Sequence, residues 1–264
     1  MVYQFLCEDN LDGIFTAVYD VFNSGFGIKN CSVQSGSDGQ CTFFCEYITV
    51  ITDIDKSIKV GNTLRTRFGS EFFETVATAA MAEPSSKKLP LNKGNAIFQT
   101  IALALSPAGG KHILSKIQEP CIFTVFELNR QTAREGHHHL GFLRFQEMQG
   151  GILYAVIHPK NRILPILGDH FSDRMPLERF IIHDPDHEEA VIHQRETPFL
   201  IVSDRLLPLP SNVNGFSDRE AQIQNLWCTF FEHIAIEQRK NKKLQQKNIP
   251  KRYWRDTTEL KSSL

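Results

Sequence analysis

A histidine, an aspartate and two arginines lie within one stretch, residues 141–184, and could transfer protons or bind phosphate. His170 and Asp173 are three positions apart, and a carboxylate beside an imidazole can orient the ring as a general acid or base. Arg144 and Arg174 carry guanidinium groups, which bind phosphate oxygens through paired hydrogen bonds. The alternative is a structural network, with Asp173 paired to an arginine and His170 bonded to a carbonyl group. We favour the network for Asp173 and keep both interpretations for His170 and Arg174.

A second candidate is the segment of residues 239–255, which we call the basic tail. It contains eight Lys and Arg residues and no acidic residue, whereas residues 1–55 contain eight acidic residues and one lysine. This split predicts an anionic partner at one end of the chain. Tyr253 and Trp254 lie among the cations, and aromatic faces stack on unpaired nucleobases at about 1–3 kcal/mol each. In the alternative interpretation, these two rings anchor the chain end on the core.

The predicted nucleic-acid-binding residues share a cationic or aromatic side chain. They are Arg144, Arg174, Arg239, Lys251, Arg252, Tyr253, Trp254 and Arg255. For catalysis, the candidates are His170 as acid or base and Asp173 as the group that orients it.

Other polar residues are typical of structural roles. His183 and Asp184 end a predicted strand, where a general base or a metal ligand could lie, but Asp184-Pro185 is typical of a turn. The three adjacent histidines at residues 137–139 cannot all face one metal ion from a helix. The sequence has no catalytic-triad pattern, zinc signature, dinucleotide fingerprint or Walker loop. We therefore expect no metal and no cofactor, and the residues alone indicate no reaction.

Composition favours a folded protein without a membrane segment. The chain has 264 residues, of which 41% are hydrophobic and 22% charged, with a formal net charge of −1. No apolar run is long enough to span a membrane, and the N-terminus lacks the pattern of a secretory signal. The six cysteines are therefore expected to be reduced, and Cys41 and Cys45 lack the second pair that a zinc site needs. We expect a cytoplasmic protein with no membrane partner.

Apolar periodicity predicts an α+β fold, in which small antiparallel sheets pack against several helices. We expect an N-terminal α+β region, residues 1–80, and a C-terminal domain, residues 81–264. The elements predicted for the first half of the chain are a strand at 2–6, a helix through Phe22 capped by Asp9-Asn10, a strand at 43–51, a helix through Phe68 after Thr52-Asp53, and helices within 70–105 and 113–134. Within the last of these ranges, residues 121–126 could also form a strand.

The second half of the sequence is predicted to form a hairpin, a helix and further strands. Residues 141–145 and 152–157 form the hairpin around a glycine turn, residues 163–171 the helix, and residues 180–182 the next strand. One or two more strands are expected within 190–202. A long amphipathic helix then begins at Ser217, and its apolar stripe is expected to be core. The stripe consists of Ile223, Leu226, Trp227, Phe230, Phe231, Ile234 and Ala235.

Several pieces of the chain together resemble a known bacterial family. They are GFLRF (141–145), ILYAVIHPKNRILPILGDHFSDR (152–174), FIIHD (180–184), LWCTFFEHIAIEQRKN (226–241) and PKRYW (250–254). The family is described as DNA metabolism or DNA repair proteins and is typically encoded beside a radical-SAM protein. Its C-terminal domain of unknown function also occurs fused to uracil-DNA-glycosylase-like domains. The resemblance implies a role in DNA metabolism and a radical-SAM partner, without a settled reaction.

These observations lead to three hypotheses. The first is a DNA-binding accessory factor in repair or modification, which binds phosphates through Arg144, Arg174 and the basic tail and acts with the radical-SAM protein. The second is an enzyme that acts on a nucleic-acid or nucleotide bond through His170 and Asp173. The third is a scaffold that binds a partner protein without contacting DNA.

Overall fold

The computed structural model describes residues 2–36, 44–83, 89–107, 109–110, 112–206, 215–234 and 236–260. The chain divides into two compact units, Met1–Arg134 and Glu135–Leu264, and the division falls within helix α5 (Pro120–Phe142). The domain boundary that the sequence predicts between residues 80 and 81 remains a prediction. The sequence also predicts a loop at residues 84–88 and a proline- and asparagine-rich linker at residues 208–214. Both lie outside the described residues, as does Cys41.

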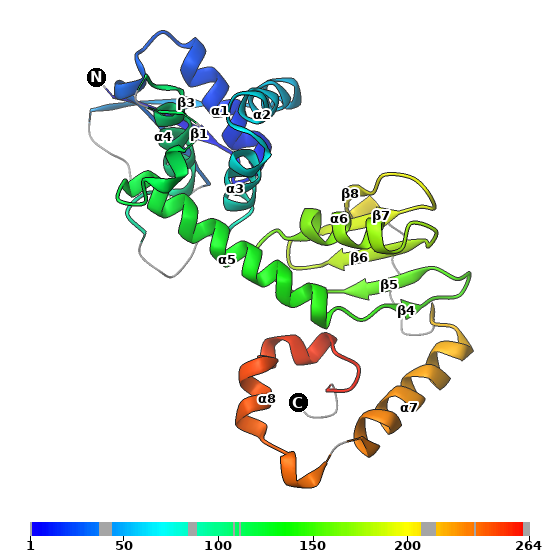
Figure 1. Ribbon diagram of the computed structural model, residues 1–264. Helices are drawn as coiled ribbons and strands as arrows, with labels where there is room; N and C mark the ends of the chain where they lie inside the picture. Colours follow the sequence, from blue (N-terminus) through cyan, green and yellow to red (C-terminus); the bar gives the residue numbers. More distant parts are fainter. Residues whose placement is uncertain are drawn as a thin grey trace. The chain divides into compact units, whose positions relative to one another are not determined.

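The first unit contains a three-stranded parallel sheet with the strand order β2-β1-β3 (Figure 1). The strands are β1 (Val2–Cys7), β2 (Cys31–Ser35) and β3 (Cys45–Thr49). The expectation of antiparallel sheets was wrong here. Helix α1 (Leu11–Asn23) stands between β1 and β2 in the sequence, and a helical crossover returns the chain in the same direction, which makes neighbouring strands parallel.

Side-chain caps begin the helices of this unit where the sequence predicts them. The Asn10 side chain accepts a hydrogen bond from the Gly13 amide at the start of α1, at 2.7 Å. Asp53 accepts one from the Lys56 amide at the start of α2 (Ile54–Phe68), at 3.1 Å. Two further helices follow, α3 (Ser70–Ala80) and α4 (Lys93–Leu105). Each cap satisfies a backbone donor that the first helical turn leaves unpaired.

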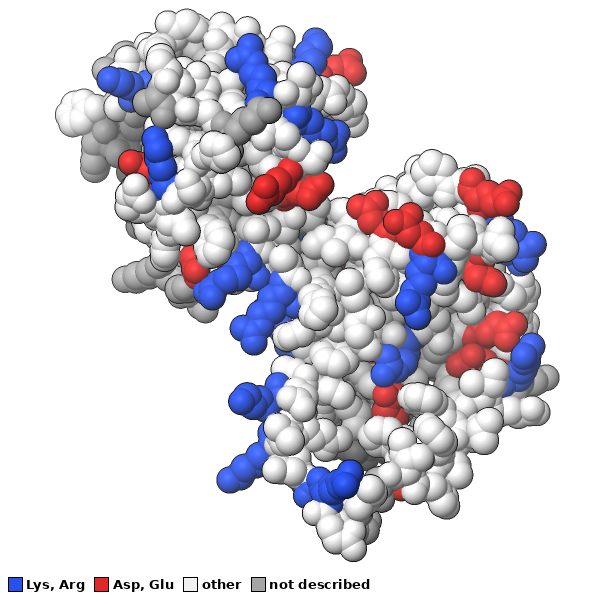
Figure 2. Space-filling view, viewed as in Figure 1, with Lys and Arg blue, Asp and Glu red and all other residues white. Residues whose placement is uncertain are grey.

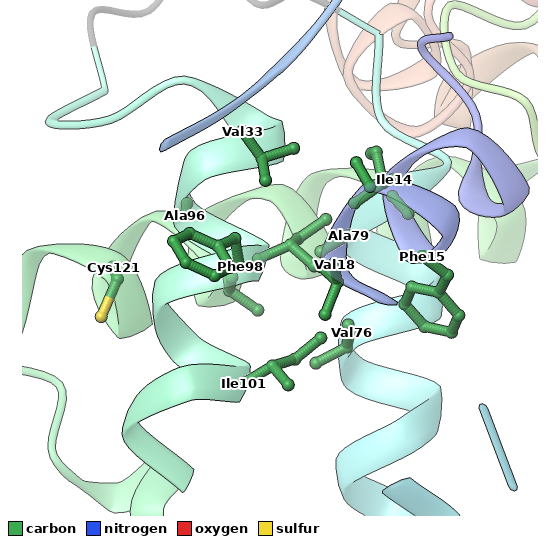
Figure 3. Close-up of a cluster of buried hydrophobic side chains, with 14 of the residues drawn as sticks. Ile14, Phe15, Val18, Val33, Val76, Ala79, Ala96, Phe98, Ile101 and Cys121 are labelled. Carbon is green, nitrogen blue, oxygen red and sulfur yellow. The ribbon is translucent and has the colours of Figure 1, made fainter. Parts of the chain in front are cut away.

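A closed apolar core holds the first unit together (Figure 3). Side chains from the sheet and from helices α1, α3, α4 and α5 meet there. Those labelled in Figure 3 are Ile14, Phe15, Val18, Val33, Val76, Ala79, Ala96, Phe98, Ile101 and Cys121. Burial of this apolar surface is the main favourable contribution to folding.

The second unit contains a mixed five-stranded sheet with the order β4-β5-β6-β7-β8. Its strands are β4 (Gln146–Glu147), β5 (Leu153–Val156), β6 (Phe180–Asp184), β7 (Glu189–His193) and β8 (Leu200–Ser203). The β5 and β6 strands are parallel because α6 (Leu164–Arg174) connects them, and the other neighbours are antiparallel. The sheet is therefore mixed rather than antiparallel as expected.

The predicted strand at 141–145 was wrong. Helix α5 continues through Phe142, and β4 begins only at Gln146. Leu140, in the last turn of α5, and Leu143, directly after the helix, both pack against the core of the second unit. The turn before β5 is as predicted, since Gly150 and Gly151 have φ values of 89° and 71°.

The expected long C-terminal helix was also wrong. Helix α7 (Asp218–His233) begins at the predicted cap, with the Ser217 hydroxyl accepting a hydrogen bond from the Glu220 amide at 3.1 Å. After it come only short elements: the 3₁₀ helix η5 (Glu237–Arg239), helix α8 (Lys242–Asn248) and the 3₁₀ helix η6 (Lys251–Asp256). No helix in the described part of the chain is both long and apolar enough to cross a membrane.

The apolar stripe of α7 does not form core as predicted. Leu226 is 70% exposed, Phe230 52% and Trp227 41%. Ile223 and Ile234 are also exposed. A helical period therefore predicted the helix correctly but not its burial, because burial requires a second apolar surface to cover the stripe.

Candidate functional site

Arg144 lies in an internal ion pair. Its Nη2 donates to Oε1 of Glu259 at 2.8 Å, and its Nη1 donates to the carbonyl groups of Gly141 and Leu143. The other carboxylate oxygen of Glu259 accepts from the indole Nε1 of Trp227 at 3.1 Å. The guanidinium group of Arg144, a candidate phosphate ligand, is thus neutralised by the Glu259 carboxylate. The same carboxylate also binds the indole ring of Trp227 in α7.

The pKa of Glu259 reflects this pairing. Burial by itself raises the pKa of the carboxyl group, because the charged form loses its hydration. Hydrogen bonds from Arg144, from the Glu259 backbone and from Trp227 favour the ionised form, and together they hold the pKa below its ordinary value. The arrangement is stable while Glu259 is ionised.

The aromatic residues of the basic tail are buried. Tyr253 is 3% exposed and Trp254 6%, and the Trp254 indole donates to the Ile249 carbonyl at 2.8 Å. The Tyr253 ring contacts His139 with a centroid separation of 4.9 Å. In this structure the two rings anchor the chain end, as in the alternative interpretation, so their faces are not open for stacking on nucleobases.

Arg252 is also internally paired. Its Nη1 lies 3.0 Å from Oε1 of Glu135, whose carboxylate is buried. The same carboxylate accepts from the backbone amides of Lys160 and Asn161 at 3.1 and 2.9 Å. Glu135 therefore joins α5, the loop before α6 and the basic tail. The Arg252 side chain is 39% exposed, but its charge is paired with this carboxylate.

His139 is buried beside this network. It is 3% exposed, and its Nε2 has no hydrogen-bond partner among the described residues. Burial, followed by the positive charge of Arg252 and the neighbouring His138 and His158, lowers the pKa of His139 to about 3. The ring is consequently neutral at physiological pH.

The remaining cations of the basic tail are exposed. Arg239, Lys242, Lys243 and Lys247 form no ion pair with any described residue, and Lys251 lies 6.0 Å above the Trp254 ring. The Arg255 Nε is 3.8 Å from Asp256. Figure 2 shows Lys and Arg side chains gathered over the α8 region of this unit. The surface of the tail therefore presents a positive field, to which Arg144 and Arg252 do not contribute as free charges.

His170 and Asp173 are not brought together. Both are exposed on α6, and within the described part of the chain no hydrogen bond joins them. The His170 ring instead packs edge-on against Phe171. Burial, followed by the negative charge of Asp173, raises the pKa of Asp169, so the electrostatic neighbour of Asp173 is another carboxylate. Arg174 is exposed at the end of the same helix.

A joined histidine and aspartate occur elsewhere in the sheet. The hydroxyl group of Tyr154 lies 2.8 Å from Nδ1 of His183, and His183 Nε2 lies 3.3 Å from Asp204. Sequence reasoning placed His183 at a strand end but missed its partners. The alternation of β6 indicates the face of His183, because Phe180 and Ile182 point to the core. No sequence feature near His183 indicates Asp204 as its partner. Asp204 directly follows β8, and it reaches the sheet because β8 pairs with β7.

The turn interpretation of Asp184 is supported. Its carboxylate is buried and accepts from the His187 amide and from His187 Nδ1, at 3.3 and 2.6 Å, which closes the turn from β6 to β7. His158 lies 3.2 Å from Asp186 in the same region. Among the residues that the structure describes, no group of three His, Cys, Asp or Glu side chains could hold a metal ion.

Comparison with known proteins identifies one family. No curated protein matches the chain. The sequence of residues 92–259, more than half of the chain, matches the family DUF4130, a domain of unknown function. The matched region contains the five-stranded sheet, α7 and the basic tail, and the family description assigns no activity to any of them. The chain belongs to the DUF4130 family.

Proposed function

We propose that this protein binds DNA as an accessory factor in repair or modification and acts with a radical-SAM protein. The observation that carries the proposal is the exposed cationic surface of the basic tail. Lys and Arg side chains that neutralise phosphates release condensed counterions, and this release drives binding to nucleic acid. The radical-SAM partner rests on the family resemblance in the sequence alone.

The structure changes the set of residues that we expect to contact phosphate. Five exposed cations of the tail carry the proposal: Arg239, Lys242, Lys243, Lys247 and Lys251. Arg174 stays a separate candidate on α6. Arg144 and Arg252 would each have to leave a carboxylate before binding a phosphate directly.

Removing three of the tail charges tests the proposal. We expect Lys242→Gln, Lys243→Gln and Lys247→Gln together to weaken DNA binding by about 10- to 100-fold at low salt. The slope of log K against log salt should become shallower by about 2.7, since each phosphate contact contributes about 0.9. Fluorescence anisotropy with a labelled oligonucleotide between 50 and 200 mM salt measures both quantities.

A matched control removes three exposed cations from the first unit: Lys29→Gln, Lys59→Gln and Arg67→Gln. It changes the net charge by the same amount but leaves the basic tail intact. Equal losses in the two triple variants would show that only net charge matters. Unchanged affinity and salt slope in the tail variant would exclude the tail as the DNA-binding surface.

Protein binding is a second candidate function, favoured by the exposed apolar face of α7. Leu226, Phe230 and Ile234 present apolar surface of the kind that marks interaction sites. Retention of a protein partner, together with no DNA affinity at low salt, would favour this scaffold role. For the enzyme hypothesis, His170 and Asp173 lack the hydrogen bond that an acid–base pair needs.

A further inference from the structure

A hollow of about 440 Å³ lies between α7 and the segment that connects α5 to β4. Its apolar wall consists of Phe145, Ile223 and Trp227, and its polar groups are Arg144, Glu220 and Gln224. Thr258, just beyond the basic tail, completes the lining. Both the volume and the mixture of aromatic and polar groups are typical of sites for small ligands.

The two aromatic rings of the hollow are held in place. Phe145 packs edge-on against Phe171 and Phe180, with centroid separations of 5.1 and 5.6 Å. Trp227 is anchored through its indole nitrogen by Glu259, and it is nevertheless 41% exposed. A fixed ring with an accessible face can stack on a planar ligand without losing much side-chain freedom.

The polar groups of the hollow offer hydrogen-bond acceptors. The buried carboxylate of Glu220 accepts from the Glu147 amide at 2.9 Å and from Gln224 Nε2 at 2.8 Å. Each carboxylate oxygen can accept a further hydrogen bond. The side-chain oxygen of Gln224 has no partner among the described residues. A ligand that carries N–H donors would satisfy these acceptors.

The charges of the hollow select against a phosphate inside it. Arg144 is already neutralised by Glu259, and Glu220 adds a further negative charge. A phosphate entering here would meet an uncompensated carboxylate, whereas an uncharged ring with an amino group would meet its acceptors. The occupant that suits both the stacking face and the acceptors is a nucleobase with an exocyclic amine.

We propose that the hollow receives one unpaired DNA base, stacked on Trp227, with its amino group facing Glu220 and Gln224. This proposal rests on the proposed DNA binding and assigns it a preference for unpaired strands. Thr258 follows Arg255 by three residues, a reach of at most about 11 Å along the chain, so phosphates beside the bound base can contact the tail. A paired base would first have to leave its stack, at a cost of a few kcal/mol.

Binding of homopolymeric single strands tests this assignment in the full chain. We expect a ten-nucleotide dC strand to bind more tightly than dT of the same length, and both to bind more tightly than a duplex. Trp227→Leu should weaken single-strand binding by about 5- to 150-fold with little effect on the duplex, since base stacking contributes about 1–3 kcal/mol. Trp227→Phe should restore most of the affinity. Phe126→Leu, which changes an equally exposed aromatic residue of α5 outside the hollow lining, is the matched control.

Tryptophan fluorescence provides a readout that a structural role would not change. The chain has two tryptophans, and Trp254 is buried. Stacking of dC on Trp227 should quench the emission, and the quenching should disappear in Trp227→Phe. Gln224→Leu should remove the preference for dC over dT while keeping the quenching.

The outcomes separate this proposal from DNA binding itself. Equal affinity for single strand and duplex, with no effect of Trp227→Leu, would overturn the base pocket and leave the tail as a DNA-binding surface. If no DNA binds at low salt, titration with deoxycytidine examines the hollow alone. Saturable quenching that requires Trp227 would then support a free-nucleoside site, and its absence would overturn the pocket as well.

Discussion

Helices α1 and α7 share a pattern of apolar residues at helical spacing but differ in burial. In α1, Ile14 and Val18 are buried, because the sheet and the other helices of the first unit close over them (Figure 3). In α7, Leu226 and Phe230 are exposed. Glu220 of α7 instead accepts a hydrogen bond from the Glu147 backbone amide of β4. The spacing of apolar residues thus predicts that a helix forms. Whether the apolar side of that helix is buried depends on a second apolar surface that covers it.

This difference gives the two helical faces different roles. The apolar residues of the first unit contribute stability, since they lose their contact with water on folding. The exposed residues of α7 contribute little to stability, and a contiguous apolar surface on a folded protein marks a place where another molecule binds. Trp227 belongs to this face and also lines the proposed base pocket.

Matched phenylalanine variants provide the largest expected contrast. Phe98 is fully buried in α4, so Phe98→Ala should lower the free energy of unfolding by about 3–5 kcal/mol. Phe230→Ala in α7 should change it by less than about 0.5 kcal/mol. Urea unfolding followed by far-ultraviolet circular dichroism measures both values. A large loss in Phe230→Ala would mean that the α7 face is covered in solution.

Matched arginine variants measure how much a partly buried ion pair and an exposed ion pair each stabilise the second unit. Arg252→Ala removes one partner of the buried Glu135 carboxylate, and we expect it to cost about 2 kcal/mol. Arg205→Ala removes an exposed pair with Glu188 and should cost less than about 1 kcal/mol. Chemical unfolding of the two variants compares them. Similar small losses would show that the Glu135 network is dispensable.

The pH dependence of stability should identify the buried His139. Its pKa is lowered to about 3 in the folded protein, whereas the unfolded chain takes up the proton near pH 6.5. Between these values the unfolded state binds more protons, so stability should fall as the pH falls, by about 1.4 kcal/mol per pH unit. His139→Gln should remove this slope between pH 6 and 4. Unfolding midpoints at several pH values measure it, and an unchanged slope would assign the acid sensitivity to other groups.

Much of the secondary structure could be predicted from the sequence because its signals are local. The caps at Asn10, Asp53 and Ser217 begin helices where expected, and the strands β1, β3, β5 and β6 lie within or next to their predicted ranges. The prediction failed at residues 141–145, where the first two residues end α5 and the next three form neither helix nor strand, although Leu143 and Phe145 pack against the core. Local preference is weaker than tertiary packing at such positions.

The candidate site was less predictable because its contacts are not local. Arg144 pairs with Glu259 and Arg252 with Glu135, and neither carboxylate is near its arginine in the sequence. Tyr253 and Trp254 were candidates for base stacking because they lie among cations, yet burial leaves that role to Trp227, which was assigned to the core. Only the fold distinguishes an exposed ring from a buried one.

By itself, the sequence determined the helix starts, the glycine turn before β5 and the concentration of positive charge near the C-terminus. These features depend on residues within a few positions of one another, through hydrogen bonds that a side chain makes to its own backbone or through composition. The tertiary structure alone decided strand direction, the exposure of the α7 face and the charges that remain available to a ligand. Each of these depends on which distant segments meet, since burial and ion pairing are properties of a contact between segments and not of either segment alone.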